Sequence, residues 1–140
     1  MQTTGVNPER LTFEVTETLW IHDLFDVVEK MRILTKTGIH FSLDDFGTGY
    51  SSLTYIKHLP IHELKIDKTF VQDAPKSKDS AALVESILAV ARHMNLQVVA
   101  EGVETREQAD FLSARGYVVY QGYFFCRPEP FDQWIKRITE

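Results

Sequence analysis

The chain has 140 residues, a length typical of one domain with its own hydrophobic core. Its net charge of −5 gives no basic surface for a nucleic acid polymer or an anionic membrane. A single cysteine rules out a disulfide framework, and no apolar run approaches the roughly 18 residues of a membrane span. These properties predict a cytoplasmic protein without a membrane segment, in which a small anionic ligand needs a metal ion or individual Lys and Arg residues.

Strand-like and helix-like segments alternate along the chain. Short apolar runs predict five strands, at residues 11–15, 39–43, 63–67, 97–101 and 118–121. Apolar residues at helical spacing predict helices at residues 24–37, 50–59, 81–94, 106–115 and 131–138. Residues 71–79 are the only linker-like segment and are too short to separate two domains. The alternation predicts an α/β fold with a parallel sheet wrapped by helices.

A polar residue recurs at the end of each predicted strand, at intervals that each fit one βα unit: Glu14, Asp44, Lys65, Glu101 and Gln121. Polar groups at the carboxyl ends of successive strands are typical of the active site of a (β/α)8 barrel. A doubly wound sheet predicts the same alternation, but it would also require a glycine-rich phosphate loop after the first strand. Thr16-Glu17-Thr18 stands there instead, which favours the barrel.

Asp44 and Asp45 are adjacent carboxylates between an apolar strand and a loop that contains Gly47 and Gly49. Neighbouring side chains on a strand point to opposite faces, so the two acids need not share a ligand. Where the pleat relaxes after the strand, both can turn toward a cation. The pair by itself is equally compatible with a turn held by an Asx hydrogen bond.

Five segments resemble one known family in order and spacing over nearly the whole chain. They are Glu14-Val15-Thr16-Glu17-Thr18, residues 44–53, Lys65-Ile66-Asp67-Lys68-Thr69-Phe70, residues 99–105 and Gln121-Gly122-Tyr123-Phe124. These segments are similar to the EAL domain, a bacterial phosphodiesterase of cyclic di-GMP named for a Glu-Ala-Leu motif. The Glu-Ala-Leu segment and a later strand with a metal-binding Asn are absent, and both are expected upstream of Met1. The resemblance therefore implies that residues 1–140 are the C-terminal portion of a single EAL domain, with about five βα units of a (β/α)8 barrel.

The resemblance also implies a site with two metal ions, either Mg²⁺ or Mn²⁺. Glu14 and Asp44 would bind one ion, and Asp44 would bridge to a second ion held by Asp45 and Glu101. The missing Glu and Asn would leave the first ion short of ligands. We therefore expect little or no activity from the isolated chain.

Five further residues are expected to act at this site by resemblance to the family: Lys65, Asp67, Gln121, Glu104 and Glu17. Lys65 would hold or polarise the attacking water, or offset phosphate charge, as an electrostatic group rather than a general base. Asp67 would orient Lys65 or a water, Gln121 would donate hydrogen bonds, and Glu104 would support the metal ligands. Glu17 would anchor the loop at residues 47–52, which in the family couples dimer contacts to metal binding.

Purely structural interpretations of some of these residues remain open. Asp67 could cap the turn at Phe70, and Glu104 could simply favour the start of the next helix. The aromatic residues at positions 117–125 are predicted mainly as core, although one ring could stack on a guanine.

The predicted reaction is hydrolysis of one phosphodiester bond of cyclic di-GMP to give linear pGpG. The alternative is a catalytically inactive module that binds cyclic di-GMP or another protein. Because an incomplete barrel exposes strand edges, we also expect a homodimer or a strand-exchanged oligomer. Upstream sensory or cyclase domains often accompany this family.

Overall fold

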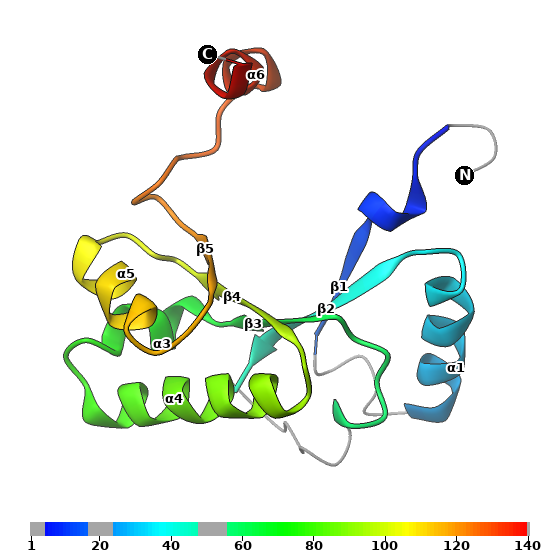
Figure 1. The fold of residues 1–140 in the computed structure, drawn as a ribbon, viewed down its shortest axis with the longest axis horizontal. Coiled ribbons are helices and arrows are strands. Elements are labelled where there is room, and N and C mark those ends of the chain that lie inside the picture. Colours follow the sequence, from blue (N-terminus) through cyan, green and yellow to red (C-terminus); the bar gives the residue numbers. More distant parts are fainter. Residues whose placement is uncertain (1–4, 17–23, 48–55, 140) are drawn as a thin grey trace.

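The computed structural model describes residues 5–16, 24–47 and 56–139, and over them the chain folds around one five-stranded parallel sheet. The strands are β1 (Thr12–Thr16), β2 (His40–Phe46), β3 (Glu63–Ile66), β4 (Gln97–Glu101) and β5 (Val119–Gln121). Each strand pairs in parallel with the next one along the chain, so their order in the sheet is the sequence order (Figure 1). A doubly wound sheet reverses its strand order. The α/β prediction, as part of a (β/α)8 barrel, is therefore confirmed.

Helices connect the strands and cover mainly one side of the sheet. They are η1 (Pro8–Arg10), α1 (Leu24–Thr35), α3 (Lys68–Asp73), α4 (Lys78–His93), α5 (Arg106–Ser113) and α6 (Phe131–Thr139). Figure 1 shows α1, α3, α4 and α5 flanking the sheet, whereas α6 stands apart beyond β5. None of the helices in the described ranges is both long and apolar enough for a membrane span.

The connection between β3 and β4 differs from the prediction. Residues 71–79 were expected to be a linker, but α3 extends to Asp73 and α4 begins at Lys78. Both helices start at a side-chain cap: Asp67 accepts a hydrogen bond from the Thr69 amide, and Ser77 accepts one from the Ser80 amide. Caps of this kind satisfy amide groups that a helix start leaves unpaired. The helix predicted at residues 50–59 lies mostly outside the described residues.

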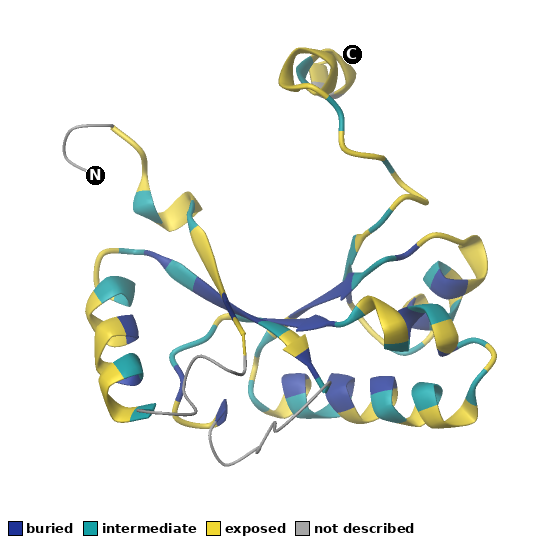
Figure 2. Ribbon diagram, turned by 180° about the vertical axis from the view of Figure 1, so that it is seen from behind, coloured by how far each residue is buried: buried dark blue, intermediate teal, exposed yellow. Residues whose placement is uncertain are grey.

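The hydrophobic core lies between the sheet and the helices. Leu43, Leu64 and Ile66 of β2 and β3 are completely buried, and Val84 and Leu88 of α4 belong to the same core cluster. Figure 2 shows this burial concentrated on the strands and on the sheet-facing side of the helices. Side chains alternate between the faces of a strand, so Lys65, between Leu64 and Ile66, points to the opposite face. The face that carries the polar residues is therefore turned away from the core.

Of the aromatic residues at positions 117–125 that were predicted mainly as core, Tyr120 packs against the core and is partly buried, whereas those that follow or flank β5 are exposed, contrary to the prediction. Tyr117 is 87% exposed, Tyr123 is 56% exposed and Phe125 is 52% exposed. Phe125 instead stacks on Tyr120, with ring centroids 5.5 Å apart. The reason is topological, because β5 is the last strand of the described sheet and no described strand pairs with its outer edge.

Candidate active site at the carboxyl ends of the strands

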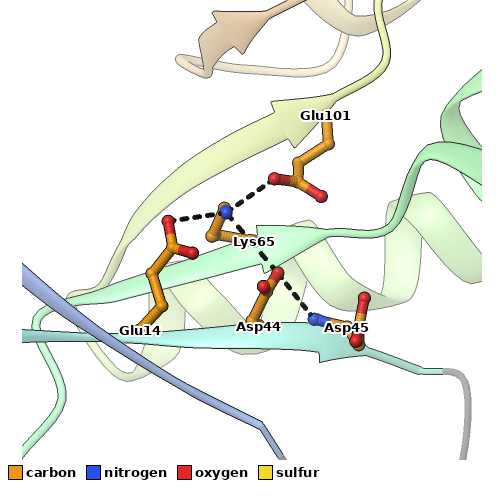
Figure 3. Close-up of polar contacts among 5 residues, drawn as sticks. All are labelled: Glu14, Asp44, Asp45, Lys65 and Glu101. Atoms are coloured by element: carbon orange, nitrogen blue, oxygen red, sulfur yellow. Dashed lines mark hydrogen bonds and ion pairs between the residues drawn. The ribbon is translucent and has the colours of Figure 1, made fainter.

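Lys65 lies at the centre of a group of charged side chains from four neighbouring strands. Its ammonium nitrogen Nζ is 2.6 Å from Glu101 Oε1, 2.8 Å from Glu14 Oε1 and 3.6 Å from Asp44 Oδ1. Figure 3 shows the three carboxylates converging on this nitrogen. We call these four residues the Lys65 cluster. The structure thus brings together four of the residues predicted from the sequence.

The sheet itself produces this convergence. Lys65 is on β3, and the three carboxylates come from β1, β2 and β4. Parallel strands present their carboxyl ends at the same edge of the sheet, where side chains of alternate positions share one face. The register places Thr16 of β1 opposite Asp44 of β2, and Lys65 of β3 opposite Val99 of β4. Glu101 lies two positions beyond Val99 and so faces the same side.

The Lys65 ammonium is buried, with its side chain 5% exposed. Burial opposes the charged form, but the hydrogen bonds to Glu101 and Glu14, together with the negative charge of Asp44, outweigh it and raise the pKa of Lys65. The side chain therefore stays protonated at neutral pH. A permanently charged ammonium suits electrostatic stabilisation of a phosphate better than proton abstraction, as the sequence analysis predicted.

Asp44 and Asp45 both lie inside β2, where the strand is irregular. The register with β3 shifts between Leu43 and Phe46, and Asp45 has a left-handed backbone with φ of 56°. Asp residues tolerate this conformation better than most. The Asp45 amide donates a hydrogen bond to Asp44 Oδ1 at 2.9 Å. The two acids were expected just after the end of the strand, but they lie at a bulge inside it. In Figure 3, Asp45 lies on the far side of Asp44 from Lys65.

The Asp45 carboxyl has an electrostatic environment of its own. Partial desolvation, followed by the negative charges of Asp44 and Asp67, raises its pKa, while Lys65 opposes the shift. A carboxylate among other carboxylates favours a bound cation or a bound proton. Asp45 is therefore chemically suited to a cation, although it does not contact Lys65 in the way that Asp44 does.

The donor atoms suit a hard divalent ion, since carboxylate oxygens are the ligands that Mg²⁺ and Mn²⁺ prefer. Within residues 5–16, 24–47 and 56–139, however, no three His, Cys, Asp or Glu side chains are placed to share one metal ion. The oxygens of Glu14, Asp44 and Glu101 are directed at the Lys65 ammonium instead. The ligand atoms of this site are thus of the kind that a divalent metal ion prefers. The Lys65 ammonium lies at the point where the carboxylates meet.

The other predicted residues occupy different positions. Asp67 accepts hydrogen bonds from the Thr69 amide and hydroxyl and caps α3, which agrees with the structural alternative. Glu104 is exposed, and Gln108 rather than Glu104 holds the start of α5, through the Glu104 and Thr105 amides. Gln121 ends β5 beside Glu101 in the register. Glu17 lies outside the described residues.

A cavity of about 620 Å³ adjoins the Lys65 cluster. It is lined by Glu101, Glu104 and Gln121 from the strand ends and by Lys68 from α3. Residues that the sequence analysis did not single out complete it, among them Arg127, Glu129 and Trp134. The only sequence signal near these residues was the helix predicted at residues 131–138, to which the sequence analysis gave no role in the site.

Cys126, Glu129 and Trp134 form one side of this cavity, and we call them, together with Arg137, the α6 wall. Arg137 joins the group: its Nη2 is 2.9 Å from Glu129 Oε2, and its Nη1 is 2.7 Å from Cys126 Sγ. The Glu129 side chain is 16% exposed. A forked guanidinium that contacts two groups fixes α6 relative to the loop after β5.

Ser42 is a second residue that the sequence analysis did not single out. It lies two positions before Asp44 on the same face of β2, is completely buried, and pairs in register with Glu14 and Glu63. Within the described part of the chain, its hydroxyl is the one buried side-chain polar atom without a hydrogen-bond partner. Side chains two positions apart on a strand lie on the same face. The pattern that identified Asp44 could therefore also have identified Ser42.

Comparisons of the sequence and of the structure with known proteins point to the same family. The model of the EAL domain matches residues 1–128. The bifunctional diguanylate cyclase/cyclic di-GMP phosphodiesterase MucR of Pseudomonas aeruginosa is 42% identical over 96% of this chain and 20% of its own length. The solved PaMucR phosphodiesterase in complex with c-di-GMP is similar with a TM-score of 0.89 at 42% identity, over 95% of this chain and 54% of that one.

A further solved structure contains a metal ion. The manganese/cy-diGMP complex of BlrP1 from Klebsiella pneumoniae is similar with a TM-score of 0.83 at 33% identity, over 91% of this chain and 32% of that one. The chain therefore spans about a fifth of the length of MucR and about half of the solved PaMucR phosphodiesterase.

Proposed function

The chain belongs to the EAL domain family, and from this premise we propose that residues 1–140 are the C-terminal portion of one EAL domain that hydrolyses cyclic di-GMP to linear pGpG. The observation that carries the proposal is the Lys65 cluster, in which side chains from β1, β2, β3 and β4 meet within 3.6 Å of one ammonium nitrogen. Related proteins named as cyclic di-GMP phosphodiesterases support the substrate.

In this proposal, divalent ions, Mg²⁺ or Mn²⁺, neutralise phosphate charge and supply a hydroxide near neutral pH. Glu14 and Asp44 would hold one ion, and Asp44, Asp45 and Glu101 would hold the second. The raised pKa of Asp45 supports this assignment, because a bound cation relieves the repulsion from Asp44 and Asp67. The manganese complex of BlrP1 supports a divalent metal.

Lys65 would act on the phosphate or on the attacking water. Its protonated ammonium is held in place by Glu14 and Glu101 before substrate arrives, so no reorganisation is needed when negative charge develops on the phosphate. Gln121, which lines the same cavity, would donate hydrogen bonds to the substrate. Glu104 and Glu17 would support the metal ligands and the loop after β2, and Asp67 would orient Lys65 or a water.

Asp44→Asn in the full-length natural protein tests the proposal. The substitution keeps the shape of the side chain and removes the charge shared by the two proposed metal sites. We expect hydrolysis of cyclic di-GMP, followed by chromatography of pGpG, to be abolished and metal affinity to fall. Asp79→Asn, at an exposed position of α4, is the matched control. Unchanged turnover in Asp44→Asn would overturn the assignment.

A catalytically inactive module that binds cyclic di-GMP is the second candidate. Two of the proposed metal ligands of the family, the Glu of Glu-Ala-Leu and an Asn, are not among these 140 residues, so we expect little turnover from the isolated chain. Calorimetry with cyclic di-GMP, with and without Mg²⁺, separates binding from hydrolysis.

Assembly forms the last part of the proposal. Within the described sheet, β1 and β5 each have one edge without a strand partner, and exposed edges invite pairing with another chain. We expect a homodimer or a strand-exchanged oligomer, working in the cytoplasm with upstream sensory or cyclase domains. Light scattering that shows a compact monomer would contradict the oligomer.

A further inference from the structure

A second cavity lies at the amino ends of the strands, away from the Lys65 cluster. It has a volume of about 550 Å³ and is lined by Glu9 of η1, by His40 at the start of β2 and by His62 directly before β3. Asp44 follows His40 by four residues on β2, and a strand rises about 3.3 Å per residue, so roughly 13 Å separates the two positions. The proposed function makes no use of this second cavity.

Backbone hydrogen bonds hold both histidines in the sheet. The His40 amide donates to the Leu11 carbonyl at 3.0 Å, and the His62 amide donates to the Phe41 carbonyl at 2.9 Å. The His62 carbonyl accepts in turn from the Gln97 amide at 3.0 Å. The two histidines are far apart in the sequence, and the parallel pairing of β2 with β3 brings them together. Their positions are therefore fixed before any ligand binds.

The two imidazole rings are close together at an angle that does not favour direct ring contact. Their centroids are 4.6 Å apart, and their planes are tilted by 45°. Aromatic pairs prefer offset-parallel or edge-to-face arrangements, and this tilt is neither. Within the described part of the chain, neither ring has a hydrogen-bond or ion-pair partner. A nitrogen of each ring is therefore available to a ligand.

The separation of the rings matches that of two histidines bound to one metal ion. A metal–nitrogen bond of about 2.1 Å places each ring centre about 3.2 Å from the ion, so two rings about 90–110° apart around it have centres about 4.5–5.2 Å apart. The observed 4.6 Å lies within this range. Imidazole suits Zn²⁺ and Cu²⁺, whereas the carboxylates of the Lys65 cluster suit Mg²⁺ or Mn²⁺. The two ends of the sheet thus differ in the ions they prefer.

We propose that His40 and His62 form a binding site for one divalent transition-metal ion, Zn²⁺ or Cu²⁺, at the amino ends of β2 and β3. No three His, Cys, Asp or Glu side chains in the described ranges are placed to share one ion, so water completes the coordination. The cavity has room for it, since a water molecule occupies about 30 Å³. The exposed Glu9 carboxylate in the cavity lining accepts a hydrogen bond from this water. The ion links the starts of two adjacent strands and stabilises the folded protein.

Electron spin resonance of bound Cu²⁺ tests the pair directly, because nitrogen couplings count the imidazole ligands. The sample is the full-length natural protein without a histidine tag, in excess Mg²⁺. His40→Gln and His62→Gln are each expected to weaken Cu²⁺ binding by roughly 10-fold or more and to reduce the coupled imidazoles from two to one. His93→Gln, exposed at the end of α4, is the matched control. Loss of binding in one of the two variants only, or in neither, would overturn the shared site.

Thermal unfolding with Zn²⁺ gives an independent measurement. An ion that binds the folded protein raises its Tm, so Zn²⁺ should raise the Tm of the wild type and of His93→Gln. It should not raise the Tm of His40→Gln or His62→Gln, and equal increases in all four proteins would overturn the proposal. None of these measurements involves hydrolysis of cyclic di-GMP, so the proposed function and the histidine site succeed or fail separately.

The double variant His40→Gln/His62→Gln shows whether the two histidines act as one site. If both bind the same ion, either single substitution removes most of the affinity, and the double variant loses little more. Calorimetry with Zn²⁺ in excess Mg²⁺ measures the three affinities. Losses that add in the double variant would show two independent histidines and would overturn the site.

Discussion

The Lys65 cluster borders the cavity of about 620 Å³ through Glu101, and the α6 wall borders it through Cys126, Glu129 and Trp134, but the two are held in place in different ways. Four adjacent strands in one hydrogen-bonded register position the cluster. The wall depends on the fork of Arg137 to Glu129 and Cys126. The comparison indicates that the charged groups proposed for catalysis are positioned by the sheet, whereas the α6 wall is positioned by a few side-chain contacts. Substitutions should therefore affect the two regions separately.

The largest effect is expected from Lys65→Met, which breaks the cluster and spares the wall. Methionine fills the buried space but leaves Glu14, Asp44 and Glu101 without their shared cation. Loss of one preorganised electrostatic group costs about 10²–10³-fold in turnover, and we expect hydrolysis by the full-length protein to fall toward the upper end of this range.

Lys78→Met is the control for this substitution, because Lys78 is exposed at the start of α4. Steady-state hydrolysis measures the turnover of both variants. Wild-type turnover in Lys65→Met would contradict an electrostatic role of the Lys65 cluster.

The next largest effect is expected from Gly122→Ala, which should disturb the wall. A Cβ atom at Gly122 would lie 2.1 Å from the Val103 carbonyl oxygen, which accepts a hydrogen bond from the Phe124 amide. Backbone atoms on both sides leave little room to adjust, so we expect the free energy of unfolding to fall by about 3 kcal/mol. Urea denaturation measures this loss.

Gly116→Ala gives the contrast for Gly122→Ala. Nothing lies within 4 Å of a Cβ at Gly116, so only its φ of 151° opposes the substitution. A smaller loss of stability is expected there. Equal losses at the two glycines would show that the approach to Val103 is not what requires a glycine at position 122.

The same contrast explains what could be predicted from the sequence. The strands and the alternation of their polar residues identified Glu14, Asp44, Lys65 and Glu101, because strand period and parallel pairing follow from local pattern. The bulge at Asp45 was not predictable, since a left-handed Asp has no distinct sequence signal. The α6 wall was missed for a related reason: contacts between Arg137 and Glu129 depend on how a loop folds back, which periodicity does not encode.

Tyr123 and Phe125 were predicted to be core residues but are exposed, and the reason is topological. Tyr123 and Phe125 have the composition of a core segment, but they follow the last strand of the described sheet, where no described strand covers them. Composition predicts that such residues prefer burial, and topology decides whether a neighbouring element buries them.

A smaller effect is expected from pH, and it sharpens the contribution of the cluster to stability. The pKa of Lys65 is raised in the folded protein above its usual value of 10.5. Its stabilising contribution is therefore fully present below pH 10.5 and is lost as pH rises from there toward the folded pKa. The difference in free energy of unfolding between the wild type and Lys65→Met should be constant from pH 7 to 10 and should then shrink. A difference that is constant up to pH 12 would contradict a raised pKa.

The smallest effect is expected at Asp67, which has two roles: it caps α3, and its charge acts on Asp45. Asp67→Ala removes both functions and should lower the free energy of unfolding by about 1 kcal/mol. Asp67→Ser keeps a capping oxygen for the Thr69 amide and should restore most of that stability. Because serine carries no charge, it should not restore the field at Asp45, so turnover should remain a few-fold below that of the wild type. If Asp67→Ser recovers turnover together with stability, Asp67 is only a helix cap, and the Lys65 cluster acts without it.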